Sequence, residues 1–156
     1  MKLGRLDVAI AGSRMTLVGR IDDSSPLGGL PDQLAAGDLV IDTAGVTFVN
    51  SIGMREWIRL LRALSSARTV TLERVADVLI TQMNLIPGLG NNVRIASFHA
   101  QYACGKCGAE VAPLIDAVAH AEGLRTLQAP KLPCPECGTA MELADFPERY
   151  LTVFKA

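Results

Sequence analysis

Apolar and polar residues alternate along the first part of the chain in a way that predicts strands. Residues 6–10 and 15–19 alternate on either side of Gly12 and Ser13, a pattern typical of a β-hairpin. Further on, the apolar runs become nearly continuous, as expected of strands that are covered on both faces. These runs are 38–42 and 46–49, which form one strand or two pieces broken at Gly45, followed by 69–73 and 93–100.

Between these runs, apolar residues return every three or four positions, which predicts helices. The clearest helix follows residue 51, and its apolar face is Met54, Trp57, Ile58, Leu61 and Leu64. A second helix is predicted over 76–86, ended by Pro87-Gly88, and a short or frayed one over 26–36. A hairpin followed by alternating strands and helices predicts an α/β fold, a mixed sheet with packed helices, over residues 1–100.

Composition and charge narrow the class of protein. Hydrophobic residues make up 49% of the chain and charged residues 20%, so there is enough apolar material for a core. Residues 1–99 carry ten basic and nine acidic groups, and residues 100–156 carry five and seven, without the basic excess of a nucleic-acid-binding domain. No apolar run approaches the roughly 18 residues that cross a membrane, and the N-terminus does not resemble a signal peptide. We therefore expect a cytoplasmic protein with neither a membrane nor a nucleic-acid partner.

Two C-x-x-C-Gly motifs lie after residue 100, and they contain all of the cysteines: Cys104, Cys107, Cys134 and Cys137. In a chain with no export signal, this pattern predicts a metal site before a disulfide framework. Two thiolates separated by two residues can bend back onto one ion, and the following glycine accommodates the tight turn. Two such knuckles complete a tetrahedral site of four sulfurs, which predicts one structural zinc ion.

Residues 101–156 are accordingly predicted to form a zinc-ribbon domain that packs rigidly on the first unit, because no flexible linker precedes Cys104. The 26 residues between the knuckles exceed the roughly 15–20 of common ribbons. The spacing of Val111, Leu114, Ile115 and Val118 predicts a helix over 111–123. Residues 139–154 are expected to return as a strand and a docking segment, with buried contacts from Leu143, Phe146, Tyr150 and Phe154.

The C-x-x-C pairs also resemble thiol-redox motifs, in which a thiolate of low pKa lies at the start of a helix. Here each pair is followed by glycine and strand-like residues, and the segment is too short for a thioredoxin-like fold. A dithiol oxidoreductase is therefore the minor alternative to a metal site.

Three segments of the first unit resemble the STAS domain, the fold of sulfate transporters and anti-sigma factor antagonists. They are LVGRID (17–22), LVIDTAGVTFVNSIGMREWIRLL (39–61) and TVTLERVADVLITQMNLI (69–86), within a resemblance that covers roughly residues 6–100. Its sharpest part runs from Asp42 to Gly53, where a strand leads into x-Ser-x-Gly at a helix start. The resemblance implies a STAS-like fold and a non-enzymatic, regulatory role in protein–protein interaction.

In phosphorylatable members of this family, the serine at this place is modified by a partner kinase that is also an anti-sigma factor, and phosphorylation releases the partner. Carried over, that serine is Ser51, and the expected interaction surface includes Asn50, Gly53 and Arg55. A phosphate at a helix start is stabilised by the helix dipole, and its charge of about −1.5 to −2 opposes a docked partner. The usual Asp before the serine is Asn50 here, which keeps the capping ability but lacks the charge.

A second interpretation of the same residues involves no phosphorylation. Asn50 or Ser51 then merely caps the helix, and Gly53 lets a partner or the neighbouring strand approach closely. The protein would be a zinc-stabilised adaptor. Arg55, Arg59 and Arg62 line another side of the helix, where they either meet an acidic partner or form a solvated face. A serine hydrolase is not expected, because the G-x-S-x-G nucleophile elbow is absent.

Overall fold

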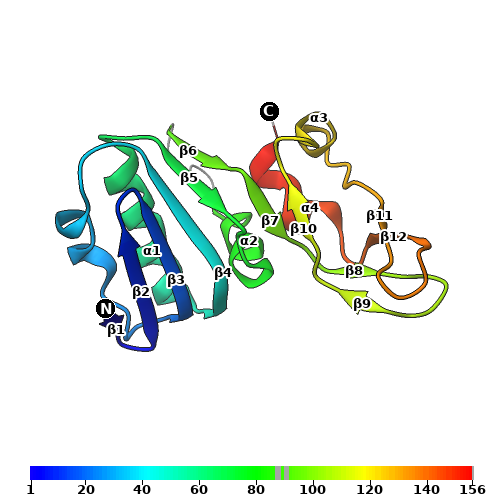
Figure 1. Cartoon of the computed structure of the whole chain (residues 1–156), viewed down its shortest axis with the longest axis horizontal. Helices are drawn as coiled ribbons and strands as arrows, with labels where there is room; N and C mark the ends of the chain where they lie inside the picture. The colour runs from blue at the N-terminus through cyan, green and yellow to red at the C-terminus, as the bar shows by residue number, and fades with distance from the viewer. Residues whose placement is uncertain (87–88, 90–91, 156) are drawn as a thin grey trace.

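The computed structural model describes residues 1–86, 89 and 92–155 (Figure 1). The predicted helix end at Pro87-Gly88 lies outside the described residues. Figure 1 shows a larger region built on a long sheet and, beside it, a smaller region of short strands that contains the C-terminal third of the chain. The α/β class and the mixed sheet predicted from the sequence are both present.

The larger region is built on one mixed sheet, to which six of the described strands belong in the order β1-β2-β3-β4-β5-β6. The first three strands pair antiparallel, as the predicted hairpin requires, and β3, β4, β5 and β6 run parallel. Gly45 lies inside a continuous β4, where the pairing with β3 becomes irregular. The strands are β1 Lys2–Leu3, β2 Leu6–Ala11, β3 Arg14–Ile21, β4 Leu39–Val49, β5 Val70–Glu73 and β6 Val93–Ile95.

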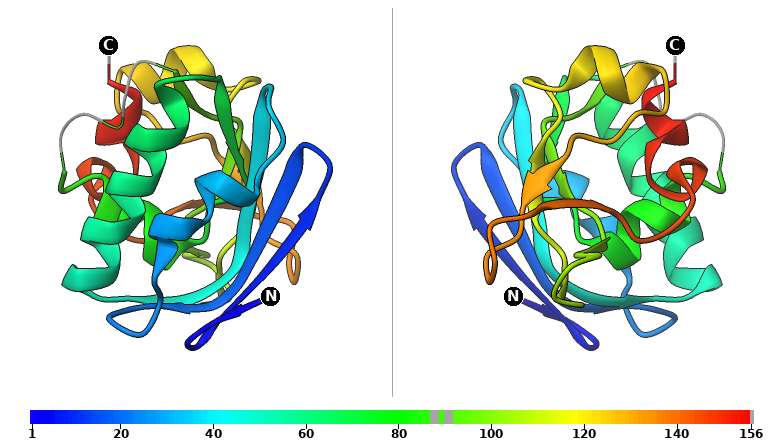
Figure 2. Two further views of the ribbon diagram at one scale, coloured as in Figure 1. Left: turned by 90° about the vertical axis from the view of Figure 1, so that its left-hand side faces the viewer. Right: turned by 90° about the vertical axis from the view of Figure 1, so that its right-hand side faces the viewer.

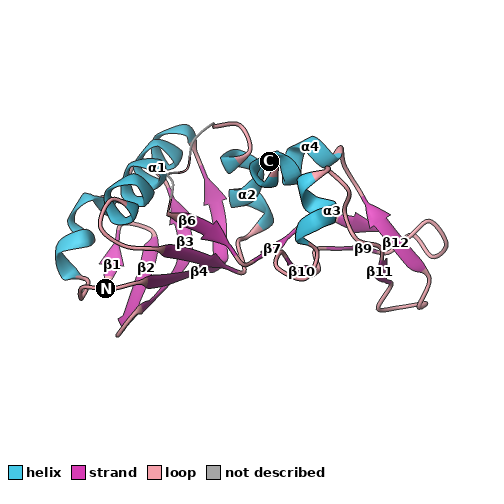
Figure 3. Cartoon of the chain, turned by 90° about the horizontal axis from the view of Figure 1, so that it is seen from above, coloured by secondary structure: helices cyan, strands magenta, loops and turns pink. Residues whose placement is uncertain are grey.

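Two helices pack on one face of this sheet. Helix α1 spans Ser51–Ser65 and buries the predicted apolar face, with Trp57 fully enclosed. Helix α2 spans Asp77–Met83 and is shorter than predicted. Figure 2 shows α1 on one side of β2 and β3, and Figure 3 shows α1, α2 and α4 (Pro147–Leu151) along the same side of the molecule.

The short helix predicted over residues 26–36 is instead two 3-10 turns, η1 Leu27–Gly29 and η2 Pro31–Gln33. Proline at position 31 has no backbone N–H to donate, so a continuous α-helical hydrogen-bond ladder cannot pass through it. The turns still bury Leu27 and Leu30. The apolar spacing was therefore a correct indication of burial and a wrong indication of helix type.

The strand predicted over residues 93–100 is divided at Ala96. The Ala96 N–H donates to the Leu72 carbonyl at 2.8 Å, and the Ala96 carbonyl accepts from the Ala117 N–H at 2.8 Å. Strand β7 (Ser97–His99) then leaves the first sheet and pairs antiparallel with β10 (Leu114–Asp116). One residue thus bonds to both regions, and the chain passes from one sheet to the next without a linker.

Short strands dominate the C-terminal region, where the helix predicted over 111–123 is absent. Strand β9 is Glu110–Val111, strand β10 is Leu114–Asp116, and helix α3 occupies Ala121–Arg125 alone. The Asp116 carboxylate accepts from the N–H groups of Val118 and Ala119, at 2.9 and 3.0 Å, which turns the chain after β10. A second small sheet has the order β11-β12-β8-β9. Its strands are β8 Tyr102–Ala103, β9 Glu110–Val111, β11 Leu132–Pro133 and β12 Ala140–Leu143.

The end of the chain docks at the end of α2; the sequence predicted a docking segment here without indicating the element that it contacts. The Asn84 side chain donates to the Arg149 carbonyl at 2.8 Å and accepts from the Val153 N–H at 2.6 Å. The ring of Phe98, in the middle of β7, lies 5.0 Å from the ring of Phe154, at the end of η3 (Thr152–Phe154). Of the predicted buried contacts, Tyr150 is buried and Leu143 and Phe154 are half-buried, whereas Phe146 is 74% exposed. The domain boundary at residue 100 stays a prediction, with β7 and β10 pairing across it.

Within the described ranges, no helix has the length and apolar character that crossing a bilayer requires.

Candidate metal centre and serine surface

The two cysteine knuckles have the same backbone geometry. In the first, the Cys104 N–H donates to the Ala109 carbonyl at 2.9 Å, and the Gly108 N–H donates to the Cys104 carbonyl at 3.0 Å. The second knuckle repeats these bonds at 2.8 and 2.9 Å. Gly108 and Gly138 both have φ of +77°, a left-handed conformation that a side chain would strain. The role predicted for the glycine after each cysteine pair is thus confirmed.

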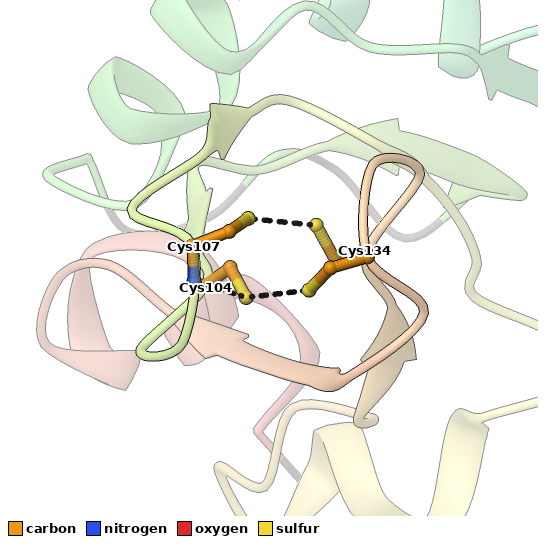
Figure 4. A group of neighbouring side chains, drawn as sticks. Cys104, Cys107 and Cys134 are labelled. Atoms are coloured by element: carbon orange, nitrogen blue, oxygen red, sulfur yellow. Dashed lines mark hydrogen bonds between the residues drawn. The ribbon is translucent and has the colours of Figure 1, made fainter.

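The four sulfur atoms converge between the knuckles. All four lie within 4.8 Å of one another, with Sγ of Cys104 at 3.5 Å from Cys137 and Sγ of Cys107 at 3.6 Å from Cys134. Figure 4 shows Cys104 and Cys107 on one loop facing Cys134 on the other. A tetrahedron of sulfurs at about 2.3 Å from a zinc ion has edges of about 3.8 Å, whereas a disulfide is about 2.05 Å long. The cysteines are free thiols placed to hold one metal ion.

The environment of the sulfurs is uneven. Cys104 and Cys134 are buried, and Cys107 and Cys137 are exposed. Hydrogen bonds from the Thr139 side chain and backbone lower the pKa of the Cys137 thiol to about 6. The Ala109 amide favours ionisation of Cys107, but the neighbouring sulfurs, Cys134 first, raise its pKa to about 12. Four thiolates this close repel one another, and a divalent cation between them would stabilise all four charges.

The helix start at Ser51 is capped by Asn50. Strand β4 ends at Val49, and Asn50 has extended backbone angles before the helix begins. The Asn50 side-chain oxygen accepts from the Gly53 N–H at 2.7 Å, which is the N-cap bond. Ser51 occupies the first helical position and is exposed, so its hydroxyl is not used as the cap. Of the two capping residues that the sequence allowed, the structure selects Asn50.

Gly53 is buried and brings the start of α1 against the end of β3. A Cβ atom at this position would lie 2.0 Å from the Ile21 carbonyl oxygen and 2.9 Å from the Asp22 nitrogen. The Asn50 N–H also donates to the Ile21 carbonyl, at 3.3 Å. The glycine of the x-Ser-x-Gly pattern therefore serves the approach of the neighbouring strand.

A groove of about 320 Å³ runs along the exposed side of α1. The three arginines of the predicted stripe border it and are exposed. Ser51 lies at one end, and Ile86 comes to the groove from the segment after α2. We name it the arginine groove, and its lining is Ser51, Arg55, Ile58, Arg59, Arg62 and Ile86. The helical spacing indicated the arginines, but no local pattern places Ile86 beside them.

An ionic network around Asp42 of β4 was not predicted from the sequence. The Asp42 side chain is 3% exposed, and its carboxylate accepts from Arg74 Nε at 2.9 Å and from Arg14 at 3.4 Å. Arg14 also pairs with Glu73 at 2.8 Å, so the network joins β3, β4 and the end of β5. Burial acts to raise the pKa of Asp42, yet the hydrogen bonds from Arg74 and the Ala44 N–H outweigh it and lower the pKa. The sequence signal for this network was Asp42 itself, an acidic residue within an apolar run that predicts a strand.

Comparison of the chain with protein-family models, with curated proteins and with solved structures finds no match. The mixed sheet and the four-cysteine cluster follow from the geometry alone. The STAS-like assignment stays a prediction from the residues.

Proposed function

We propose that this protein is a non-enzymatic regulatory module that binds a protein partner through the surface around Ser51, as an anti-sigma factor antagonist of the STAS type does. The partner that the resemblance implies is an anti-sigma factor with serine kinase activity, in the cytoplasm. The observation that carries the proposal is the exposure of Ser51 at the start of α1. Its hydroxyl is exposed at the first position of a fifteen-residue helix, and Asn50 has taken over the capping bond.

The order of elements supports the STAS-like part of the proposal. An opening hairpin leads through parallel pairing of β3 and β4 to the carboxyl end of β4, where Asn50 and Ser51 follow at once. Residues just beyond the carboxyl end of a parallel strand face solvent at the sheet edge, where ligands of α/β proteins commonly bind. Ser51 therefore lies where a partner can reach it.

Phosphorylation of Ser51 would change this surface strongly. The phosphate would bring a charge of about −1.5 to −2 to the helix start, where unpaired backbone N–H groups and the helix dipole stabilise it. A partner that docks on the uncharged surface would then meet a bulky anion. The physical effect is a switch between a bound and a released state.

Asn50 in place of the family's usual Asp has a local reason. Its side-chain nitrogen lies 3.5 Å from the Asp23 carboxylate, to which it donates. An aspartate at position 50 would set two like charges at this distance. Asn50 also favours the second candidate function, a zinc-stabilised adaptor without phosphorylation, because it lacks the negative charge that helps to orient the serine.

The chemistry of the sulfur cluster supports zinc as the bound metal. Four cysteine thiolates in a tetrahedral arrangement suit Zn²⁺ or an iron–sulfur centre, and knuckles of this kind are typical of zinc. Four protein ligands leave no open coordination position, so the proposed role is structural. This closed set also weighs against a dithiol oxidoreductase, as does the position of the cysteines in turns between short strands, since among the described helices none begins at a cysteine.

The proposal is tested by cross-linking in living cells. A photoreactive amino acid replaces Ile52, which is exposed beside Ser51, and a control protein carries it at Ala9 on the sheet. We expect one protein to be captured from position 52 and not from position 9. Introducing Ser51→Asp should reduce the capture at least about tenfold, and Ser51→Ala should preserve it. Equal capture by both variants would contradict the switch, and intact mass of the protein from cells reports phosphorylation directly.

A further inference from the structure

The arginine groove has a definite chemical character. Three arginines border it, and its lining contains no carboxylate among the described residues. The whole chain has a formal charge of −1, so the positive charge of the groove is local. We infer that the arginine groove binds an acidic amphipathic helix of the protein partner, an inference that rests on the proposed function and names the chemistry of its partner.

Two of the arginines, Arg55 and Arg59, are available to an external anion. Arg55 is exposed, and it forms no ion pair with any carboxylate in the described part of the chain. Arg59 pairs with Glu56 at 3.2 Å, but both side chains reach solvent, and exposed pairs of this kind are weak. A carboxylate from a partner can therefore engage both guanidinium groups, and arginine binds carboxylates in a two-pronged geometry.

Apolar side chains supply the second half of the interaction. Ile58 is 4% exposed and Ile86 is half-buried, and both line the groove between the charged tips. Next to the lining in sequence, Ile52 and Leu85 are 47% and 75% exposed. A groove with apolar residues inside and arginines at its border matches the composition of protein–protein contact sites.

The spacing of the arginines fits a helical partner. Positions 55, 59 and 62 follow one another at intervals of four and three on α1, so along the axis they rise by about 6 and about 4.5 Å. A second helix presents carboxylates at the same rises when its acidic residues are also spaced by four and three. The partner segment would therefore carry three acidic residues on one side, beside an apolar residue that enters the groove.

A nucleic acid fits the groove less well than an acidic helix. Proteins that bind single strands combine basic residues with aromatic side chains on which the bases stack. Among the described residues, the lining of the arginine groove has no aromatic side chain, and its apolar members are isoleucines. The groove therefore offers contacts to aliphatic side chains and carboxylates, and no platform for bases.

The position of Ser51 connects the groove to the proposed switch. Ser51 and Arg55 are one helical turn apart, and both line the groove. A phosphate on Ser51 would pair with Arg55 and repel the carboxylates of the partner helix. Modification would thus close the end of the groove by charge as well as by bulk.

The test uses the full-length, metal-loaded protein and a synthetic fluorescent helix. The probe is a stapled peptide with three glutamates spaced by four and three residues and a leucine on the same side, and its matched control has glutamine for each glutamate. We expect the acidic probe to bind, with amide shifts in NMR spectra confined to α1 and the segment at residues 84–86. The control peptide and the double variant Arg55→Ala/Arg59→Ala should each lower the affinity at least about tenfold. The matched double variant Arg94→Ala/Arg125→Ala, at exposed sites elsewhere, should bind within about twofold of the wild type.

Each of these results would overturn the inference: equal binding of the two peptides, binding that survives loss of Arg55 and Arg59, or tighter binding of a short single-stranded RNA than of the acidic probe. No binding of the acidic probe would overturn it as well. These failures are separable from failure of the proposed function. If the double arginine variant still cross-links its cellular partner from position 52 and still responds to Ser51→Asp, the proposed function stands and the acidic-helix inference is wrong.

Discussion

The two regions of the molecule are stabilised in different ways. In the larger region, β3 and β4 have eight and eleven residues, and with α1 they bury a continuous aliphatic core. In the C-terminal region, β8, β9 and β11 have two residues each, and the elements meet at four sulfur atoms. Large apolar surfaces stabilise long elements, whereas a segment with too little core depends on a cross-link or a metal. We therefore expect packing to stabilise the larger region, and the C-terminal region to depend on a metal ion at the four sulfurs in addition to its own buried residues.

The largest expected effect comes from removing the metal. Chelation, or Cys104→Ser, should unfold residues 101–155, because a structural zinc site contributes roughly 10 kcal/mol to folding. Hydrogen exchange should show loss of protection in β8, β12 and α4, with protection retained in β3, β4 and α1. Elemental analysis should find one zinc per chain in the wild type and none in the variant.

The control for this experiment is Lys106→Ser, an exposed change in the same knuckle that leaves all four sulfurs in place. Simultaneous loss of protection in both regions would show that the boundary at residue 100 is wrong. Full protection of the metal-free protein would show that packing alone holds the C-terminal region.

Packing in the larger region is tested most directly by Gly53→Ala. The new Cβ would lie 2.0 Å from the Ile21 carbonyl oxygen, so the start of α1 must move away from β3. We expect the free energy of unfolding to fall by about 3 kcal/mol, measured by urea denaturation. In the control Gly28→Ala, the added Cβ would have no neighbouring atom within 4 Å. This change should alter the free energy of unfolding by less than about 0.5 kcal/mol. Equal effects of the two changes would mean that this close approach is not a feature of the folded protein.

A smaller effect is expected from the Asp42 network, and it depends on pH. The pKa of Asp42 is lowered below its ordinary value of 3.8, so the ionised form stabilises the folded state. That contribution is complete above about pH 4 and is lost as the pH falls through the folded pKa. Asp42→Asn should lower the free energy of unfolding by about 1–2 kcal/mol at pH 7. The effect is kept this small because Arg14 and Arg74 are half exposed and solvent screens their charges. The variant should also lose less stability than the wild type between about pH 4 and pH 2. Asp7→Asn, at an exposed pair with Lys2, should leave the acid profile unchanged.

The smallest effect distinguishes the cap from the exposed hydroxyl. Asn50→Ala removes the bond to the Gly53 N–H and should lower the free energy of unfolding by about 1 kcal/mol. Ser51→Ala should change it by less than about 0.5 kcal/mol, because the hydroxyl is exposed. Thermal denaturation of the two variants side by side measures the difference. A larger loss from Ser51→Ala would make Ser51 the structural residue and remove the basis of the proposed function.

The two regions also differ in how well local apolar spacing predicts their elements. The spacing of apolar residues predicted α1 correctly, because a long amphipathic helix on a sheet is governed by its own periodicity. The same spacing from Val111 to Val118 predicted a helix where β9 and β10 are found. The pairing of β10 with β7 outweighs a weak local preference there, and a short segment has too few turns to oppose it.

The candidate sites divide in a similar way. The spacing of the cysteines was sufficient to predict a common site, because each pair and its glycine form a turn that depends on nearby residues alone. The pattern around residue 51 indicated an exposed serine or a cap without distinguishing them. The choice of Asn50 as the cap, and of Ile21 as the neighbour of Gly53, required the distance between α1 and β3.

The order of the residues was enough to predict the α/β class, the long helix after Ser51 and the four residues that can hold a metal. These features depend on short-range spacing, and short-range spacing is written directly in the chain. The tertiary structure decided that β7 leaves the first sheet, that Arg14 and Arg74 neutralise a buried carboxylate, and that Ile86 completes the arginine groove. Each of these contacts joins residues that are distant in sequence, and burial and charge pairing choose among them only when the whole chain has packed.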